Sequence, residues 1–366
     1  MTRPLRLLLA AQPLDGGVSR HVVELAQALP AEIAVEVACP RTSLTWSTLE
    51  SSGVRLHEIE AHRKPRPGDA RSLGTLVKLA GDADVVHVHS AKAGFVGRLA
   101  ASLRGKRAAC AFTPHGWSWW AADGAEAQIY LRLERLAAHW CRTIVALSND
   151  ERAAGFAAQV GRAEQYRVIP NGVPLERFAL PRDPVRGRIL MVGRLAPPKR
   201  PDLALRAFAK ARARIPEAEL HVVGDGPLRA EAEALAADLG VAEAVRFLGN
   251  RDDVPELLVQ AECALLASDY EGCPLAVVEA MAASVPVAAT ASGGTGELVR
   301  PGATGALAAK GDVEGLADAL VQVLADPARA AELGAEGRRD AERDLSLERM
   351  VGRLVALYDE LARTRD

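Results

Sequence analysis

The chain has 366 residues, of which 49% are hydrophobic and 25% are charged, a composition typical of globular proteins and long enough for two cores. Its formal net charge of -2 gives no general attraction to polyanions, so we expect no nucleic-acid partner. Its five cysteines are scattered without a C-x-x-C pair, which argues against a structural zinc and favours a reducing cytosol.

The first 11 residues contain Arg3 and Arg6 followed by a short apolar run. This run is too short for a signal peptide or a membrane span, and no later run reaches the roughly 18 apolar residues that a span requires. We therefore expect a cytoplasmic protein that at most attaches to the inner face of a membrane.

Short apolar runs alternate with longer helical patterns along the chain, which predicts an α/β fold with parallel sheets covered by helices. In the first half, the expected strands span residues 7–11, 35–39, 54–59, 85–89, 108–112, 144–147 and 167–169. In the second half, they span residues 189–192, 220–223, 245–248, 264–266 and 287–289. We therefore expect two doubly wound domains, with ligands beyond the carboxyl ends of the strands.

Proline, glycine and charged residues gather in residues 181–188, which we interpret as the linker between the domains. The first domain then spans residues 1–180 and the second spans residues 189–345. The last segment, residues 346–366, has apolar residues at helical spacing after Ser346, which predicts an amphipathic terminal helix.

Gly16 and Gly17 follow the first expected strand. Glycines at such a place let backbone N–H groups approach a phosphate or a sugar, although they also suit a plain turn. The chain has no G-x-G-x-x-G pattern, since Arg229 takes the place of the third glycine after Gly224 and Gly226. This argues against a dinucleotide enzyme.

Histidines follow two other strands of the first half. His87 and His89 form an H-x-H pair at a strand end, and His115 comes just past the next strand. An H-x-H pair suggests a metal, but we find no carboxylate or third histidine placed to complete such a site. Structural or acceptor-side roles are therefore favoured for His87 and His89.

Tryptophans concentrate directly after His115, as Trp117, Trp119 and Trp120. Flat apolar rings suit the faces of sugars or cyclitols, which favours an acceptor-binding loop or a mobile lid. Core packing explains these tryptophans about equally well. Upstream, the expected helix 92–107 carries several arginines and lysines, among them Arg98. This helix suits contact with anionic lipid, although a packed helix with a solvated basic end is the simpler interpretation.

Two cations, Arg194 and Lys199, follow the strand 189–192 and Gly193. Because they lie beyond a strand end, we favour a ligand-binding role for these two side chains. The alternative is that both are solvated cations of a loop. The adjacent Arg200 is expected to face solvent.

Two carboxylates surround an expected helix start in the segment E-G-C-P-L-A-V-V-E, from Glu271 to Glu279. Pro274 suits the first helical position, where its missing N–H costs nothing. A helix N-terminus attracts phosphate, which we expect near Cys273, Leu275 and Ala276. Glu279 then lies about 7 Å further along the axis, within reach of a ribose. For an isolated pair, a solvated loop Glu and a surface helix Glu would be the simpler interpretation.

Short motifs follow one another along nearly the whole chain. They are Gly16-Gly17-Val18, Thr113-Pro114-His115-Gly116, Pro170-Asn171-Gly172-Val173, Val192-Gly193-Arg194 with Lys199, Gly224-Asp225-Gly226-Pro227, Phe247-Leu248-Gly249, the E-x7-E segment from Glu271 to Glu279, and Gly293-Gly294 with Glu297. Together these segments resemble glycosyltransferase family 4, retaining enzymes of the GT-B fold that use nucleotide sugars.

The resemblance implies two Rossmann-like domains facing a central cleft. Residues 1–180 would bind the acceptor, residues 189–345 would bind the nucleotide sugar, and the helix of residues 346–366 would return toward the first domain. No metal ion or other cofactor is expected to be required.

The resemblance also assigns roles to residues. It places Arg194 and Lys199 on the diphosphate, whose negative charge grows as the glycosidic bond breaks. Glu271 and His115 would orient the sugar, and Glu279 would hold the ribose. The donor-binding residues are Gly16, Gly17, Gly193, Gly226, Gly272, Cys273, Pro274, Leu275, Ala276 and Glu279.

The expected reaction is transfer of a sugar from a nucleoside diphosphate to an acceptor hydroxyl, with retention of the anomeric configuration. UDP is the favoured nucleotide, followed by GDP or ADP. The acceptor is a lipid-linked envelope polysaccharide precursor or a small molecule such as an aminocyclitol. A nucleotide-sugar epimerase, a glycoside hydrolase and a non-catalytic nucleotide-sugar-binding protein are the alternatives. The oligomeric state stays open.

Overall fold

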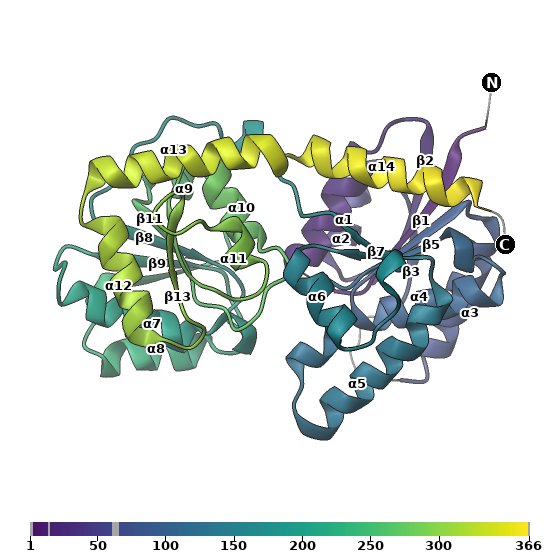
Figure 1. The fold of residues 1–366 in the computed structure, drawn as a ribbon, viewed down its shortest axis with the longest axis horizontal. Coiled ribbons are helices and arrows are strands. Elements are labelled where there is room, and N and C mark those ends of the chain that lie inside the picture. The colour runs from purple at the N-terminus through teal and green to yellow at the C-terminus, as the bar shows by residue number, and fades with distance from the viewer. Residues whose placement is uncertain (1–2, 14, 61–65, 365–366) are drawn as a thin grey trace. The chain divides into compact units, whose positions relative to one another are not determined.

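The computed structural model describes residues 3–13, 15–60 and 66–364, and it divides the chain into two compact units. The first unit comprises Met1–Pro170 together with Leu347–Asp366, and the second comprises Asn171–Ser346. Each unit contains one parallel sheet with helices packed against it (Figure 1).

The first unit has a seven-stranded sheet in the order β3-β2-β1-β4-β5-β6-β7. Its strands are β1 (Leu5–Ala11), β2 (Ile33–Cys39), β3 (Arg55–Glu58), β4 (Val85–His89), β5 (Cys110–Thr113), β6 (Thr143–Ala146) and β7 (Tyr166–Val168). Its α-helices are α1 (Gly16–Ala28), α2 (Leu44–Leu49), α3 (Asp69–Asp82), α4 (Ala91–Leu103), α5 (Gly124–Ala137), α6 (Asn149–Ala157) and α14 (Leu347–Arg363). Short 3-10 turns are η1 (Arg107–Ala109), η2 (Ser118–Ala121), η3 (Ala138–Trp140) and η4 (Ala163–Gln165).

The second unit has a six-stranded sheet in the order β10-β9-β8-β11-β12-β13. Its strands are β8 (Arg188–Val192), β9 (Glu219–Val223), β10 (Val245–Gly249), β11 (Cys263–Leu266), β12 (Val287–Thr290) and β13 (Gly305–Ala308). Its α-helices are α7 (Pro201–Arg212), α8 (Arg229–Asp238), α9 (Val254–Gln260), α10 (Leu275–Ala282), α11 (Thr295–Leu298), α12 (Val313–Leu324) and α13 (Pro327–Asp344). Its 3-10 turns are η5 (Leu175–Phe178), η6 (Pro197–Lys199) and η7 (Ala242–Ala244).

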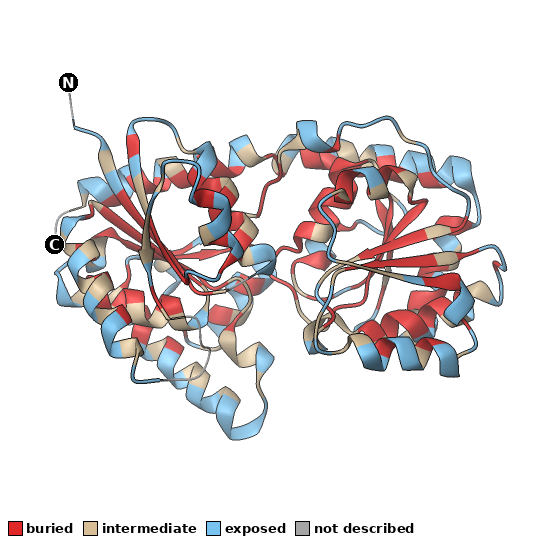
Figure 2. Cartoon of the chain, turned by 180° about the vertical axis from the view of Figure 1, so that it is seen from behind, coloured by how far each residue is buried: buried red, intermediate tan, exposed pale blue. Residues whose placement is uncertain are grey.

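The central strands of both sheets are buried, as Figure 2 shows by their red colour, whereas the edge strands β3 and β10 are largely intermediate or exposed. The central strand β1 illustrates the cause, because its consecutive leucines, Leu7, Leu8 and Leu9, alternate between two apolar layers and are all buried. Such continuous apolar runs are typical of parallel strands covered by helices on each side. The predicted α/β fold with two Rossmann-like sheets is therefore confirmed.

Each of the twelve expected strands overlaps a strand of the structure, but the sequence analysis missed β13. Its sequence, Gly-Ala-Leu-Ala, contains no β-branched or aromatic residue and so has low strand propensity. The strand forms because it pairs in parallel with β12, and a side chain at Gly305 would lie 2.0 Å from the carbonyl oxygen of Val287. Close backbone contact, not propensity, therefore determines this edge strand.

The chain passes from the first unit to the second at Pro170 and Asn171, which is earlier than the linker expected at residues 181–188. Backbone hydrogen bonds attach the intervening residues to the second unit. The N–H of Val173 donates to Leu345 O at 3.0 Å, and that of Asp183 donates to Val259 O at 3.1 Å. Composition could not reveal these bonds, because proline and glycine mark irregular backbone whether or not it is packed.

The terminal helix α14 packs within the first unit. Its apolar residues Met350, Leu354, Leu357 and Leu361 are buried in the same core cluster as β1 and α1. The hydroxyl of Tyr358 on α14 lies 2.7 Å from Nδ1 of His87 in β4. Figure 1 shows α14 in yellow. Among the described residues, no helix has both the length and the apolarity that crossing a membrane requires.

Candidate functional site

In the second unit, α10 begins after the loop of residues 267–274 that follows the carboxyl end of β11. Pro274 is the N-cap, with φ -70° and ψ 116°, and its carbonyl accepts the N–H of Val277 at 3.0 Å. The helix therefore starts at Leu275, one residue later than the sequence predicted. Because the first N–H groups of a helix have no acceptor within the helix, this end suits an anion, and its contact with phosphate stays a prediction.

Glu271 and Lys199 form an ion pair near this helix start. Lys199 Nζ lies 2.5 Å from Oε1 of Glu271, which also accepts a hydrogen bond from Ser268 Oγ at 2.6 Å. Glu271 is only 8% exposed, so the pair is partly shielded from water. The two residues meet because β8 and β11, which precede them, are neighbours in the sheet.

The loop that carries Glu271 and Gly272 is held by the loop after β12. The backbone oxygen of Glu271 accepts the N–H of Gly294 at 3.0 Å. Gly293 has φ +54°, and a Cβ there would lie 2.1 Å from the same oxygen. Glycine is therefore required at position 293 for the two loops to pack.

Asn171 also positions this segment, since its side-chain Nδ2 donates to the carbonyl of Cys273 at 2.7 Å, and both residues are buried. The sequence analysis noted Asn171 only as part of a family motif and missed this contact. An asparagine 102 residues from its partner gives no local signal of the pairing.

Glu279 lies on α10 and is 1% exposed. The simpler interpretation of a solvated surface glutamate is therefore wrong. A buried carboxylate on a helix is unusual without a specific partner or ligand. Its contact with a ribose stays a prediction.

Arg194 follows β8 and Gly193 and is exposed. The loop is shaped by the neighbouring loop after β9: Gly193 N–H donates to Val223 O at 2.9 Å, and a Cβ at Gly226 would lie 2.3 Å from Leu195 O. Gly226 thus permits close packing of the two loops. Its contact with the donor stays a prediction.

Arg200, which was expected to face solvent, is partly exposed but is also paired with two carboxylates. Its guanidinium bonds to Asp202, with Nε 2.9 Å from Oδ1, and Nη1 lies 3.1 Å from Asp269 Oδ1. The hydrogen bonds to Asp202 raise the pKa of Arg200 further above its ordinary value. Arg200 therefore ties the loop after β8 to the loop after β11.

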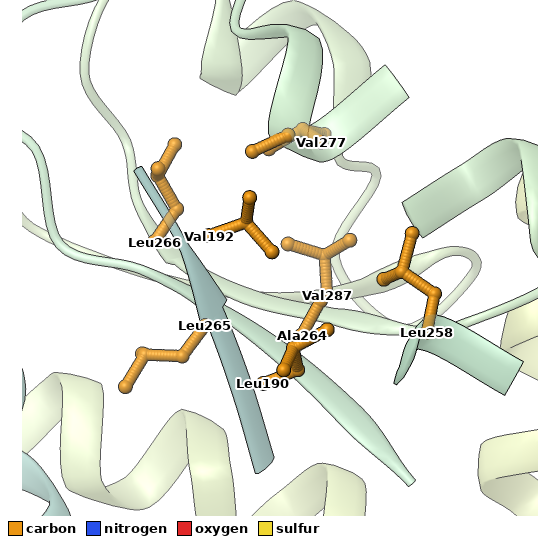
Figure 3. A pocket seen from close by; sticks show the side chains of 9 residues that line it. Leu190, Val192, Leu258, Ala264, Leu265, Leu266, Val277 and Val287 are labelled. Carbon is orange, nitrogen blue, oxygen red and sulfur yellow. The ribbon is translucent and has the colours of Figure 1, made fainter. Parts of the chain in front are cut away.

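A small cavity of about 10 Å³ lies between the sheet of the second unit and the helices α9 and α10 (Figure 3). Its lining is entirely apolar and includes Leu190, Val277 and Val287. A space this small holds at most one water, which would find no polar partner there. It is a packing gap and not a ligand site.

In the first unit, His115 lies in the loop after β5, with φ 55°, followed by Gly116 with φ 90°. A buried glutamate that the sequence analysis missed holds this turn: Glu151 Oε1 accepts the N–H of Gly116 at 2.5 Å, and Oε2 accepts that of Leu147 at 2.6 Å. Burial raises the pKa of Glu151 to about 7. A glutamate in the first turn of α6 looked like an ordinary helix-start residue in the sequence.

His115 also belongs to a histidine cluster. His115 Nε2 lies 3.0 Å from Nδ1 of His89, and one nitrogen each of His21, His89 and His115 lie within 4.8 Å of one another. Burial lowers the pKa values of His89 and His115 well below 6.5. The sequence analysis found no third histidine, because His21 on α1 is far from the others in the chain.

Trp117 is a core residue, so its proposed role as an acceptor-binding side chain is wrong. It is 1% exposed, its Nε1 donates to Glu151 O at 2.7 Å, and its ring stacks on Trp119 with centroids 4.7 Å apart. Trp119 and Trp120 are partly exposed, and their contact with an acceptor stays a prediction.

Arg98 on α4 is buried and does not belong to a lipid-facing basic surface. Its Nη2 lies 2.6 Å from Oε2 of Glu134 on α5, and its guanidinium covers the ring of Phe112 at 3.7 Å.

Gly16 and Gly17 are the exposed first residues of α1, and space around Gly16 is open. Their contact with a phosphate or sugar stays a prediction.

Two parallel Rossmann-like sheets of seven and six strands, with charged loops beyond strand ends, define the GT-B class. Solved structures support this class. HepE of Anabaena in complex with UDP-glucose aligns with a TM-score of 0.83 and 22% identity over 97% of this chain and 99% of that chain. Sucrose-phosphate synthase of Thermosynechococcus elongatus aligns with a TM-score of 0.79 and 24% identity over 98% and 99%.

Family models match both halves of the chain: a glycosyl transferase 4-like domain at residues 16–172 and glycosyl transferases group 1 at residues 173–340. A UDP-Gal:alpha-D-GlcNAc-diphosphoundecaprenol alpha-1,3-galactosyltransferase of Escherichia coli is 31% identical over 86% of each chain. A GDP-mannose-dependent phosphatidylinositol monomannoside mannosyltransferase of Mycolicibacterium smegmatis is 34% identical over 50% of this chain and 53% of that one. The chain therefore belongs to the group 1, GT4-like glycosyltransferases and is a nucleotide-sugar-dependent glycosyltransferase.

Proposed function

We propose that the enzyme transfers a hexosyl or N-acetylhexosaminyl group from a UDP-sugar to an acceptor hydroxyl with retention, and that the second unit binds the donor. The observation that carries this proposal is the Lys199–Glu271 ion pair near the start of α10. The Escherichia coli relative, which has UDP-Gal in its name, matches 86% of this chain, and HepE was solved with UDP-glucose. The GDP-mannose-dependent relative matches only 50% of this chain, so we favour UDP over GDP.

Lys199 and Arg194 contact the diphosphate in this proposal. An ammonium group has three N–H donors, so the bond to Glu271 leaves two for phosphate oxygens. The pair also fixes the lysine side chain before the donor binds, which reduces the entropy lost on binding. The N–H groups at the start of α10 add fixed positive dipoles.

The other proposed donor contacts lie in the loop before α10 and along this helix. Gly272, Cys273, Leu275 and Ala276 approach the diphosphate, and the carboxylate of Glu279 accepts the ribose hydroxyls. Glu271 bonds the sugar with its remaining acceptor capacity. The contributions of His115, Gly16 and Gly17 to the sugar and phosphates are part of the same proposal.

The bond between the anomeric carbon and the diphosphate oxygen breaks, and the oxygen keeps the electron pair. The acceptor hydroxyl attacks the same face of the sugar, and its proton passes to the departing phosphate oxygen. Arg194, Lys199 and the α10 start stabilise the negative charge that develops there. In this proposal the chain's own cations and dipoles supply that stabilisation.

The first unit is proposed to bind the acceptor, with Trp119 and Trp120 as candidate contacts. The names of the curated relatives include diphosphoundecaprenol and phosphatidylinositol acceptors, which favours a lipid-linked acceptor over a small soluble one. Such an acceptor would bring the enzyme to the inner face of the membrane.

Donor binding is tested by calorimetric titration with UDP, GDP, ADP, TDP and NAD, each with and without magnesium. We expect the tightest binding with UDP, independent of magnesium, and weaker binding of UDP by Glu279→Gln. Glu126→Gln, an exposed glutamate on α5, is the control and should bind UDP as the wild type does. Binding of NAD alone, or of no nucleotide, would contradict the proposed site.

Product analysis then separates the possible reactions. Transfer of the sugar to a polyprenyl diphosphate-linked acceptor, with the α-configuration retained, is the expected outcome. Release of free nucleotide with an epimerised sugar in the absence of acceptor would favour the epimerase. Donor hydrolysis far exceeding transfer would favour a hydrolase.

A further inference from the structure

Three histidines of the first unit converge from three separate elements. His21 lies on α1, His89 ends β4, and His115 follows β5 in a turn held by Glu151. The helix and the strand are rigid elements, and two backbone hydrogen bonds to one buried carboxylate fix the turn. The three rings are therefore held near one another by the fold and not by mobile segments.

The distances suit coordination of one ion. Nδ1 of His89 and Nε2 of His115 are 3.0 Å apart, close to the roughly 3.3 Å between two nitrogens that share a tetrahedral zinc with bonds of about 2.0–2.1 Å. The ring centroid of His21 is 4.8 Å from that of His115 and 5.3 Å from that of His89. All three ligand atoms lie within 4.8 Å of one another, so a separation of that length must shorten by about 1.5 Å to reach this spacing.

The hydrogen bonds of the rings also bear on the site. Nδ1 of His89 and Nε2 of His115 contact each other, so a bound ion would replace this contact. The other nitrogen of His89, Nε2, is buried and makes no hydrogen bond to any described residue, so rotation of this ring breaks no other hydrogen bond. His115 is only partly buried, which leaves a side from which an ion can enter.

We propose that His21, His89 and His115 form a binding site for a zinc-class divalent transition-metal ion. Imidazole nitrogen suits zinc, whereas magnesium and calcium prefer oxygen ligands, so the site is selective against the common hard cations. Three histidine ligands leave a fourth tetrahedral position for water. His115 is also proposed to contact the donor sugar, so the zinc site is proposed for the protein without donor, and its test contains no nucleotide.

The test is calorimetric titration of chelator-treated, full-length protein with zinc chloride in the absence of nucleotide. We expect one zinc ion per chain, and binding at least about tenfold weaker in His21→Gln. His139→Gln, which changes an exposed histidine outside the cluster, is the matched control and should bind like the wild type. Absence of zinc binding by the wild type, or equal affinity in His21→Gln, would overturn the proposal.

A second measurement keeps the test decisive if His21→Gln unfolds, which its thermal transition without metal would show. Cobalt(II) replaces zinc and has visible absorption bands that differ between four-coordinate and six-coordinate ions. Wild-type protein with one equivalent of cobalt should give the strong four-coordinate spectrum, and excess zinc should remove it. A six-coordinate spectrum throughout the titration would contradict the site.

Discussion

At the residue scale, the loop after β8 carries three cations with different surroundings. Lys199 pairs with Glu271, Arg200 pairs with Asp202 and Asp269, and Arg194 is the exposed one that follows Gly193. The Arg200 side chain therefore connects the loop after β8 to the loop after β11. Arg194 and Lys199 are the two that the transfer reaction is proposed to use.

Arg194→Ala should lower kcat by about 10²–10³-fold at saturating donor, the usual cost of removing one group that stabilises charge in the transition state. Steady-state transfer assays measure this directly. Arg206→Ala, which removes an exposed arginine on α7, is the matched control and should keep normal turnover. Normal turnover in the Arg194 variant at saturating donor would remove Arg194 from the reaction.

Gly293→Ala should destabilise the second unit by about 1–3 kcal/mol and weaken UDP binding, because residue 293 has φ +54° and its new Cβ would meet Glu271 O at 2.1 Å. Urea denaturation and UDP titration test both effects. Gly296→Ala is the control: Gly296 is three residues away, and a Cβ there has no neighbour within 4 Å. Equal stability of the two variants would show that the loop contact is not restrictive.

At the element scale, α14 joins the core of the first unit through apolar residues and one buried polar contact. The Tyr358 hydroxyl lies 2.7 Å from His87 Nδ1, and His87 Nε2 lies 2.8 Å from Thr113 Oγ1. These contacts join the last helix to β4 and β5. The helix therefore stabilises the strands whose ends carry His89 and the His115 turn.

Tyr358→Phe should destabilise the first unit by about 1–3 kcal/mol, because it leaves a buried nitrogen of His87 without its partner. All five tryptophans, at positions 46, 117, 119, 120 and 140, lie in this unit, so tryptophan fluorescence during urea unfolding reports its stability. Tyr130→Phe on α5, whose hydroxyl makes an exposed contact with Glu126, should change stability by no more than about 0.5 kcal/mol. Equal effects would contradict the role given to Tyr358.

The loop between β5 and η2 depends on the first turn of α6, because Glu151 accepts N–H groups from Gly116 and Leu147. Its pKa is raised from 4.5 to about 7 by burial. The folded state therefore holds the Glu151 proton between about pH 4.5 and 7, whereas the unfolded state has released it. The contribution of this group to stability is complete below pH 4.5 and is lost as the pH rises toward 7.

Relative to Glu151→Gln, the wild type should lose up to about 3 kcal/mol of stability as the pH rises from 4.5 to 7.5, and little beyond. Urea unfolding of both proteins at several pH values measures the difference. Comparison with the variant cancels the contributions of other titrating groups. A difference that is constant with pH, or that changes in the opposite direction, would contradict the raised pKa.

At the scale of the whole molecule, each unit has its own sheet and its own core clusters. Most of the proposed donor residues, among them Arg194, Lys199, Glu271 and Glu279, belong to the second unit, whereas the histidine cluster and the proposed contacts Gly16 and Gly17 belong to the first. UDP should therefore protect mainly the second unit, and zinc should protect the first.

Hydrogen exchange measured by mass spectrometry tests this division. UDP should slow exchange in residues 193–199 and 271–282, and zinc without nucleotide should slow it around His21, His89 and His115. Protection by UDP that is confined to the first unit would contradict the assignment of the donor to the second. Equal protection of both units by zinc would show that its effect is not local.

Much of the fold and part of the candidate site could be predicted because their signals are local. Apolar runs such as Leu7–Ala11 mark buried strands, and E-G-C-P-L-A-V-V-E marks a helix start between two carboxylates. Strand ends then place Arg194, His115 and Glu271 in loops beyond the sheet edge. The weak strand β13 was missed because its residues have little propensity of their own.

The sequence by itself determined a two-sheet α/β architecture and which loops carry its charged residues, because backbone periodicity and turn signals act over a few residues. That the chain is a glycosyltransferase was indicated by its resemblance to a known family. Only the tertiary structure decided that Lys199 meets Glu271, that Asn171 holds Cys273, that Trp117 is core, and that His21 joins His89 and His115. Lys199 and Glu271 are 72 residues apart in the chain, and Asn171 and Cys273 are 102 residues apart. Such contacts depend on the order of the strands in each sheet. No local sequence pattern encodes that order.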